Sequence, residues 1–130
     1  MKKGRILLAE ENRLSVLAIT NMLNNKIECL DWVSNSKKLI QKYQSEQQYD
    51  LILLNTWLEN SLGITRKIRA REAAPNGKFT PIIGLFSEWV EDKHFRSAIY
   101  RQYFKAGMND VFPQTLTNDD IDKILEKYIL

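Results

Sequence analysis

Three short runs of uninterrupted apolar residues are the strongest strand candidates in this sequence. They cover residues 5–9 (RILLA), 51–54 (LILL) and 81–86 (PIIGLF). Continuous apolar runs, unlike alternating ones, are typical of strands that are covered on both faces, as in a parallel sheet. Two weaker runs, at residues 28–33 (ECLDWV) and 110–112 (DVF), bring the predicted number of strands to five.

Helical patterns separate the predicted strands. Apolar residues recur at one-face spacing after the candidate N-cap Asn12, within residues 36–46, and after TNDD, where Thr117 and Asp120 have capping-box spacing. The residues expected to face the core are Leu14, Leu17, Ala18 and Met22 in the first helix, Leu39, Ile40 and Tyr43 in the second, and Ile121, Ile124, Leu125 and Tyr128 in the last. This alternation predicts a single α/β domain over residues 1–130, with one doubly wound parallel sheet covered by helices on both faces.

The composition is that of an ordinary globular protein. Hydrophobic residues make up 44% of the 130 residues and charged ones 27%, which excludes a disordered chain. Cys29 is the only cysteine, so an intramolecular disulfide is excluded. Glu10 and Glu11 end the first apolar run, which is too short for a signal peptide, and no stretch is long enough to span a bilayer. We therefore expect a cytoplasmic domain that makes no membrane contact.

The net charge of +3 is mild, and basic residues are densest in residues 66–78 (RKIRAREAAPNGK). This run permits an acidic partner without requiring one. Because neither stacking aromatics nor a recognition motif accompanies it, we expect no nucleic-acid binding.

The residues that follow the predicted strands form the candidate site. Ligands of an open parallel sheet bind outside the carboxyl ends of the strands, where the strand order reverses. Glu10 and Glu11 follow the first strand, Asn55 ends the third, and Phe86 ends the fourth. Asn55 has neither acidity nor useful nucleophilicity, which is unexpected at such a position.

Several blocks, taken in order, resemble the receiver domains of two-component response regulators, especially those of hybrid sensor histidine kinases. The blocks are RILLAEEN, YDLILLN, TRKIR, TPIIGL and AGMNDVF, with Gly63 eight residues after Asn55. The resemblance covers nearly the whole chain. It implies the flavodoxin-like receiver fold, a five-stranded parallel sheet with strand order 2-1-3-4-5.

In this family an aspartate after the third strand accepts a phosphoryl group, with help from a magnesium-binding acidic pair, a Thr or Ser and a Lys. Asn55, Phe86 and Gln114 stand at the aspartate, hydroxyl and lysine positions, so three of these parts are degenerate. Matching Pro113 to the family's proline would instead place Phe112 at the lysine position, and neither alignment restores a lysine. The resemblance therefore implies a non-enzymatic pseudo-receiver that works without phosphorylation.

Glu10 and Glu11 stand at the acidic pair, each one methylene longer than aspartate. We regard them as vestigial and expect no cofactor, with weak Mg²⁺ binding as the alternative. A second alternative is phosphorylation of a substitute carboxylate, for which Glu59 is the candidate. A third is a flavodoxin-like ligand-binding domain, although the first loop, AEENRLS, is acidic and lacks the glycine that a phosphate cradle needs.

The segment after Phe86 is longer than is usual in the family. If residues 88–105 form one helix, then Phe95, Ala98, Ile99, Tyr103 and Ala106 face the sheet. Trp89, Tyr100 and Phe104 then face outward and are the predicted partner interface. The alternative is a helix broken near Asp92, with the aromatics packed back into the core.

The family's switch pairs a small residue after the fourth strand with an aromatic on the fifth. Here the sizes are exchanged, with Phe86 and Val111 at the two positions. Our hypothesis is that Phe86 fills the space between them and locks one conformation. The partners implied by the resemblance are signalling proteins, such as a histidine kinase or an output domain, or a second copy bound through the fourth helix and fifth strand.

Overall fold

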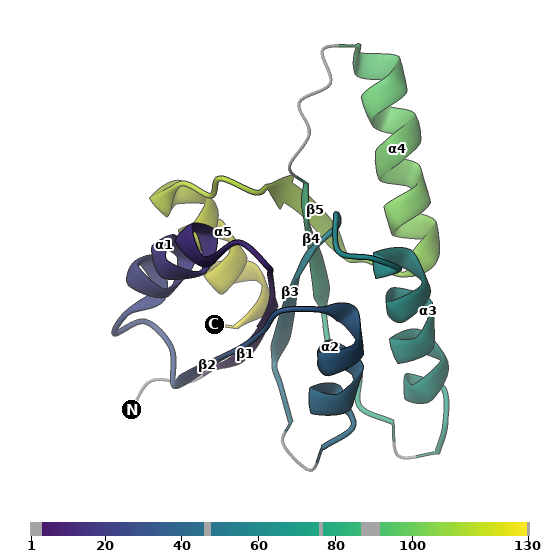
Figure 1. The fold of residues 1–130 in the computed structure, drawn as a ribbon, viewed down its shortest axis with the longest axis horizontal. Helices are drawn as coiled ribbons and strands as arrows, with labels where there is room; N and C mark the ends of the chain where they lie inside the picture. The colour runs from purple at the N-terminus through teal and green to yellow at the C-terminus, as the bar shows by residue number, and fades with distance from the viewer. Residues whose placement is uncertain (1–3, 46–47, 76, 87–91, 130) are drawn as a thin grey trace.

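The computed structural model describes residues 4–45, 48–75, 77–86 and 92–129. Within these ranges five strands and five helices alternate along the chain (Figure 1). In order they are β1 (Arg5–Ala9), α1 (Arg13–Leu23), β2 (Cys29–Val33), α2 (Ser36–Tyr43), β3 (Leu51–Asn55), α3 (Ser61–Glu72), β4 (Ile82–Phe86), α4 (Lys93–Ala106), β5 (Asp110–Pro113) and α5 (Asn118–Tyr128).

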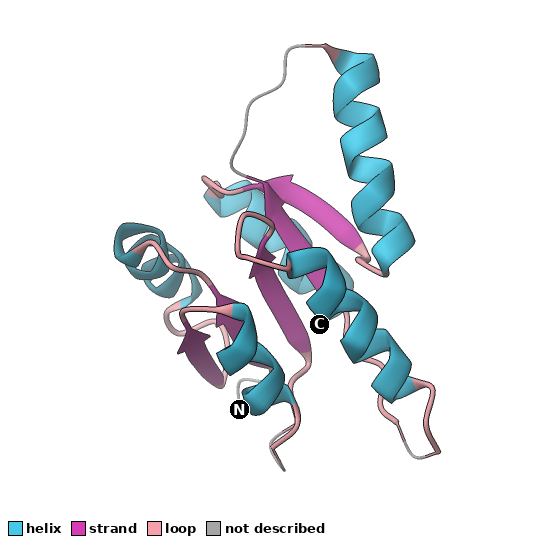
Figure 2. Cartoon of the chain, turned by 45° about the vertical axis from the view of Figure 1, so that its right-hand side comes forward, coloured by secondary structure: helices cyan, strands magenta, loops and turns pink. Residues whose placement is uncertain are grey.

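The strands form one parallel sheet in the order β2-β1-β3-β4-β5. The predicted α/β class and the strand order implied by the family resemblance are confirmed. Strand β3 lies at the centre and is buried at all five positions, as its unbroken apolar run predicts. Helices lie on both sides of the sheet (Figure 2).

Successive residues of the strands serve two separate cores because their side chains point to opposite faces. Ile6, Leu8 and Leu53 pack with residues of α1 and α5, such as Ile19 and Ile124. The intervening residues of the same strands, Leu7, Ala9, Ile52 and Leu54, belong to the second core. There they pack with Leu39 of α2, Ile64 and Ile68 of α3, and Tyr103 near the end of α4. The two cores position the strand ends that carry the candidate site.

Two of the predicted helix caps are confirmed. The side chain of Asn12 accepts hydrogen bonds from the backbone N–H groups of Leu14 and Ser15, and Thr117 and Asp120 form a capping box. The predicted inner face of α1 is wrong in part, since Leu14 is 78% exposed and Leu17 is 58% exposed, whereas Met22 packs against the core as expected. The helix buries Ile19 and Leu23 instead, and this was ambiguous because apolar residues surround most of its circumference.

Helix α4 begins later than the single helix expected over residues 88–105. Asp92 is its N-cap and accepts hydrogen bonds from the backbone of His94 at 2.8 Å and Phe95 at 3.2 Å, which agrees with the position of the alternative break. The other part of that alternative, aromatics packed back into the core, does not hold for Phe95 and Phe104, which are exposed. The expected inner position of Phe95 is wrong, because its side chain is 61% exposed. In Figure 1, α4 extends beyond the edge of the sheet, so its first turns have no strand to pack against.

Gly107 ends α4 in the left-handed region, with φ at 119°. Its backbone N–H is bonded to Phe104 and Tyr103, which closes the last turn of the helix. A Cβ atom at Gly107 would lie 2.6 Å from Cγ of Arg69 on α3. Glycine is therefore required here both by the backbone angle and by the close approach of α3.

Candidate functional site

Three strand ends bring Glu10, Asn55 and Gln114 into direct contact. Glu10 is fully buried, and its Oε1 accepts a hydrogen bond from Nδ2 of Asn55 at 2.8 Å. Its Oε2 accepts one from Nε2 of Gln114 at 3.0 Å. The backbone N–H of Asn12 also donates to Oε1, at 3.0 Å. Both oxygens of this carboxylate are therefore occupied by N–H donors; we call Glu10, Asn55 and Gln114 the amide cluster.

The backbone around Glu10 holds the carboxylate in place. Its N–H donates to the carbonyl of Val33 at 3.0 Å, and its own carbonyl accepts from Nε1 of Trp32 at 2.5 Å. Sequence reasoning did not single out Trp32, whose only signal was its position near the end of a weak strand. These contacts tie β1 to β2 and leave Glu10 little freedom to turn toward solvent.

The amide of Asn55 is oriented by a second contact. Its Oδ1 accepts from the backbone N–H of Trp57 at 2.9 Å, which turns Nδ2 toward Glu10. A carboxylate at this position would instead face Glu10 with like charge inside a buried site. A buried carboxylate needs donors around it, and the neutral amides of Asn55 and Gln114 supply them without adding charge.

The side chain of Gln114 reaches the site by donating to Glu10. This is the behaviour expected from the alignment that places Gln114 at the family's lysine position. Its Nε2 also lies 3.4 Å from Oγ of Ser15, a residue of α1 that sequence reasoning did not identify. Phe112, the residue at the lysine position in the alternative alignment, packs against the core on the α1 and α5 side. The structure therefore favours the first alignment.

The donors of this site do not fit a magnesium ion. Mg²⁺ needs near-octahedral coordination by oxygen, whereas the oxygens of Glu10 face N–H groups of Asn55 and Gln114. Glu11 is exposed and lines a pocket elsewhere. Among the residues that the structure describes, no group of three or more His, Cys, Asp and Glu side chains could hold a metal ion.

The pocket that Glu11 lines has a volume of about 580 Å³ and lies beside the starts of α2 and α3. Glu59, the candidate substitute carboxylate, is exposed at its edge, near Lys37 and Lys67. The carbonyl of Glu59 accepts from Oγ of Ser36 at 2.5 Å. Within the described ranges no hydrogen bond or ion pair joins its side chain to the amide cluster.

Phe86 is buried at the end of β4, with 7% of its surface exposed. Its ring contacts Tyr100 edge-on, with centroids 5.6 Å apart, and lies 6.1 Å from the ring of Tyr103. These three residues are called the aromatic clamp below. The locking hypothesis requires Phe86 to be buried, and it is. The rings that contact Phe86 come from α4, however, and Val111 pairs with Gly84 in the sheet.

The predicted interface residues differ in their surroundings. Phe104 faces outward as expected and is 46% exposed. Tyr100, also expected on the outer side, is instead half-buried, with its ring packed edge-on against Phe86 of β4. Trp89 lies outside the described residues.

A comparison with solved structures identifies the fold. The receiver domain of the sensor histidine kinase PA1611 from Pseudomonas aeruginosa superposes with a TM-score of 0.76 at 26% sequence identity, over 98% of both chains. The chain has the fold of a receiver domain. That PA1611 structure has a magnesium ion coordinated in its active site cleft. This receiver also superposes on full-length ShkA with a TM-score of 0.75 at 27% identity, covering 98% of this chain and 24% of that one.

Two curated relatives resemble nearly the whole chain. It is 25% identical to the transcription factor SKN7 of Chaetomium thermophilum over 98% of its length, and 23% identical to the sensor protein ArcB of Escherichia coli over 95%. It spans only 16% and 15% of those relatives' own lengths. No family model matches the chain. None of the helices that the structure describes is long and apolar enough to cross a membrane.

Proposed function

We propose that this receiver is a pseudo-receiver, a module that binds signalling proteins in a two-component or phosphorelay system without being phosphorylated. The observation that carries this proposal is the amide cluster. Asn55, at the phosphoacceptor position, donates its amide to Glu10 at 2.8 Å. The buried carboxylate at the centre of the cluster is satisfied by the protein itself.

The chemistry of phosphoryl transfer supports the proposal. The lone pair of an amide nitrogen is delocalised, so Asn55 is no nucleophile at neutral pH. An incoming phosphoryl group would also bring negative charge next to Glu10, and Gln114 has no charge with which to offset it. The proposed role therefore involves neither catalysis nor a cofactor.

The aromatic clamp supports a single resting conformation. Phe86 occupies the position where working receivers carry a small hydroxyl residue, and its ring is packed against Tyr100 and Tyr103. Close-packed interiors resist both voids and insertions, so moving Phe86 would require α4 to be repacked. We propose that α4 is held in one position and presents a constant surface to its partner.

The partner is proposed to be a protein of the same signalling system, such as a histidine kinase or an output domain. Because the receiver covers a small part of its relatives, such a domain can belong to the same protein or to a separate one. We propose a cytoplasmic location for the interaction.

Intact mass spectrometry after incubation with acetyl phosphate and magnesium tests the proposal. We expect the mass of the wild-type protein to stay unchanged, and a phosphoryl adduct would refute the proposal. Glu59→Gln is the matched variant: an adduct present in the wild type and absent from this variant would establish the substitute carboxylate as the acceptor.

A further inference from the structure

The pocket beside the starts of α2 and α3 contains none of the residues of the amide cluster. Its volume of about 580 Å³ is within the range of pockets that hold small molecules. It is lined by residues that follow three neighbouring strands: Glu11 after β1, residues 34–37 after β2 and residues 58–60 after β3. Ligands of an open parallel sheet bind outside such strand ends, where the strand order reverses, and the order here reverses between β1 and β3. The fold therefore places this pocket where a ligand is expected.

The inner part of this pocket is apolar and firmly built. Leu58 and Ile64 are buried, and half-buried Ile40 of α2 also lines it. All three residues pack in the second core. Oγ of Ser36 donates to the carbonyl of Glu59 at 2.5 Å, which joins the start of α2 to the loop after β3. Contacts within the protein thus form the pocket in advance, so it can receive an apolar group without rearrangement.

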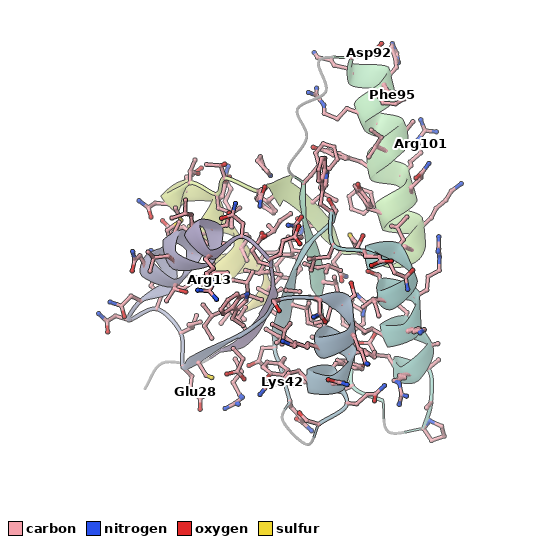
Figure 3. All side chains as sticks on the ribbon, viewed as in Figure 1. Arg13, Glu28, Lys42, Asp92, Phe95 and Arg101 are labelled. Carbon is pink, nitrogen blue, oxygen red and sulfur yellow. The ribbon has the colours of Figure 1, made fainter. Side chains whose placement is uncertain are left out.

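Two lysines, Lys37 of α2 and Lys67 of α3, line this pocket from different helices. The two helices lie side by side in Figures 1 and 3, and the pocket is at the opposite end of α2 from the labelled Lys42. Lys37 and Lys67 are exposed, and neither forms an ion pair with the carboxylates that the structure describes. The pocket therefore combines an apolar floor with two available ammonium groups.

The other residues that line the pocket restrict the charge and shape of a ligand. Glu11 and Glu59 lie there too, and their like charge opposes a ligand that carries several negative charges. None of the described residues around the pocket is aromatic, so a nucleobase would find no ring on which to stack. An inorganic anion would leave the apolar floor uncovered. A molecule with one negative charge and an aliphatic body matches all of these features.

We propose that this pocket binds a small organic acid, a molecule with one carboxylate and an aliphatic body. The carboxylate pairs with the ammonium groups of Lys37 and Lys67, and the aliphatic body covers Leu58, Ile64 and Ile40. This inference goes beyond the proposed role as an interaction module, because it gives the domain a small-molecule ligand in addition to a protein partner.

Titration of the intact ¹⁵N-labelled chain with octanoate, followed by NMR, tests the proposal. We expect saturable shifts of the backbone amide signals of Ile40 and Ile64, with a dissociation constant in the millimolar range or below for a ligand of this size. Octylamine has the same aliphatic chain with the opposite charge. It should bind about fivefold more weakly or worse, because its ammonium group would meet the two lysines.

Lys37→Gln with Lys67→Gln should weaken the binding of octanoate by about threefold to tenfold, since two exposed charge pairs are lost. The control, Lys38→Gln with Lys93→Gln, removes the same charge from exposed positions that do not line the pocket. It should alter the binding by less than about twofold. Amide signals far from the substituted residues that stay in place confirm that both variants are folded.

An absence of saturable shifts, or shifts confined to other parts of the chain, would overturn the inference. Equal binding of octylamine, or equal binding of octanoate to the Lys37 and Lys67 variant, would also overturn it. Adenosine monophosphate that binds the pocket more tightly than octanoate would overturn it in favour of a nucleotide. The outcome is separable from the proposed function, because a phosphoryl adduct is detected by mass whether or not octanoate binds.

Discussion

Replacing Asn55 with aspartate should destabilise the protein rather than restore a receiver's chemistry. The substitution removes the hydrogen bond to the charged Glu10, worth about 1.5–3 kcal/mol. It also places two carboxylates in contact, and at about 4 Å their repulsion is about 4 kcal/mol for an effective dielectric constant near 20. The pair can escape this repulsion by binding one proton. Protonating an ordinary carboxyl group at pH 7 costs about 4 kcal/mol, so this value is the upper limit of the stability that the substitution can remove.

We therefore expect Asn55→Asp to lower the free energy of unfolding by about 2–4 kcal/mol at pH 7. This upper limit falls by about 1.4 kcal/mol for each unit by which the pH is lowered, so the loss of stability should be smaller at pH 5 than at pH 7. Urea denaturation of both proteins at the two pH values measures this. Asn118→Asp, the same chemical change at an exposed position, is the control and should stay within about 0.5 kcal/mol of the wild type.

Unchanged stability of Asn55→Asp at pH 7 would refute the reasoning. Stabilisation of the wild-type protein by millimolar magnesium in the same assay would refute the conclusion that its site does not fit this ion. A change in the fluorescence of the exposed Trp57 on adding acetyl phosphate and magnesium would show that one substitution restores switching, which we do not expect.

Three further substitutions test the scaffold. Phe86→Ala should cost about 3–5 kcal/mol of stability by emptying the aromatic clamp, and should speed amide hydrogen exchange in α4 more than in α1; equal changes in both helices would contradict the clamp. Gly107→Ala should lower the melting temperature, since both φ and the space beside Arg69 oppose a Cβ, and an unchanged value would argue against this geometry. In the wild type the hydroxyl of Tyr49 donates to Asp31 and lowers the pKa of that carboxyl group, and Tyr49→Phe removes this hydrogen bond. The variant should therefore be less stable than the wild type above about pH 4, and the difference between their urea midpoints should close as Asp31 is protonated. A difference that grows in acid would contradict this reasoning.

The parts of this fold that could be predicted are those that depend on neighbouring residues. Continuous apolar runs identified the three inner strands, and Thr117 with Asp120 identified the start of the last helix. The order of the strands is a long-range property, and it was available through the family resemblance rather than the hydrophobic pattern. The face of α1 was ambiguous because Leu14 and Leu17 form as good an apolar stripe as Ile19 and Leu23.

The candidate site was predictable in its members and not in its contacts. The positions of Glu10, Asn55 and Gln114 at strand ends follow from the sheet. Their hydrogen bonds depend on side-chain rotation and on pairs as far apart as 104 residues, which no local pattern records. The exposed side of α4 depends on how the helix docks against β4, where Tyr100 and Tyr103 meet Phe86, and this long-range packing is not recorded in the local pattern.

The contact between Glu10 and Gln114 has a consequence for the order of folding. It joins the end of the first strand to the residue after the fifth, across almost the whole chain. During synthesis Oε2 of Glu10 lacks its donor, Nε2 of Gln114, until the fifth strand has left the ribosome and joined the sheet. Closing such a long loop is slow compared with forming helices, so the cluster should be among the last contacts to form. A chain truncated before residue 114 would thus keep the residues of all five strands but leave Oε2 of Glu10 without its donor, which favours an open state in which water solvates that oxygen.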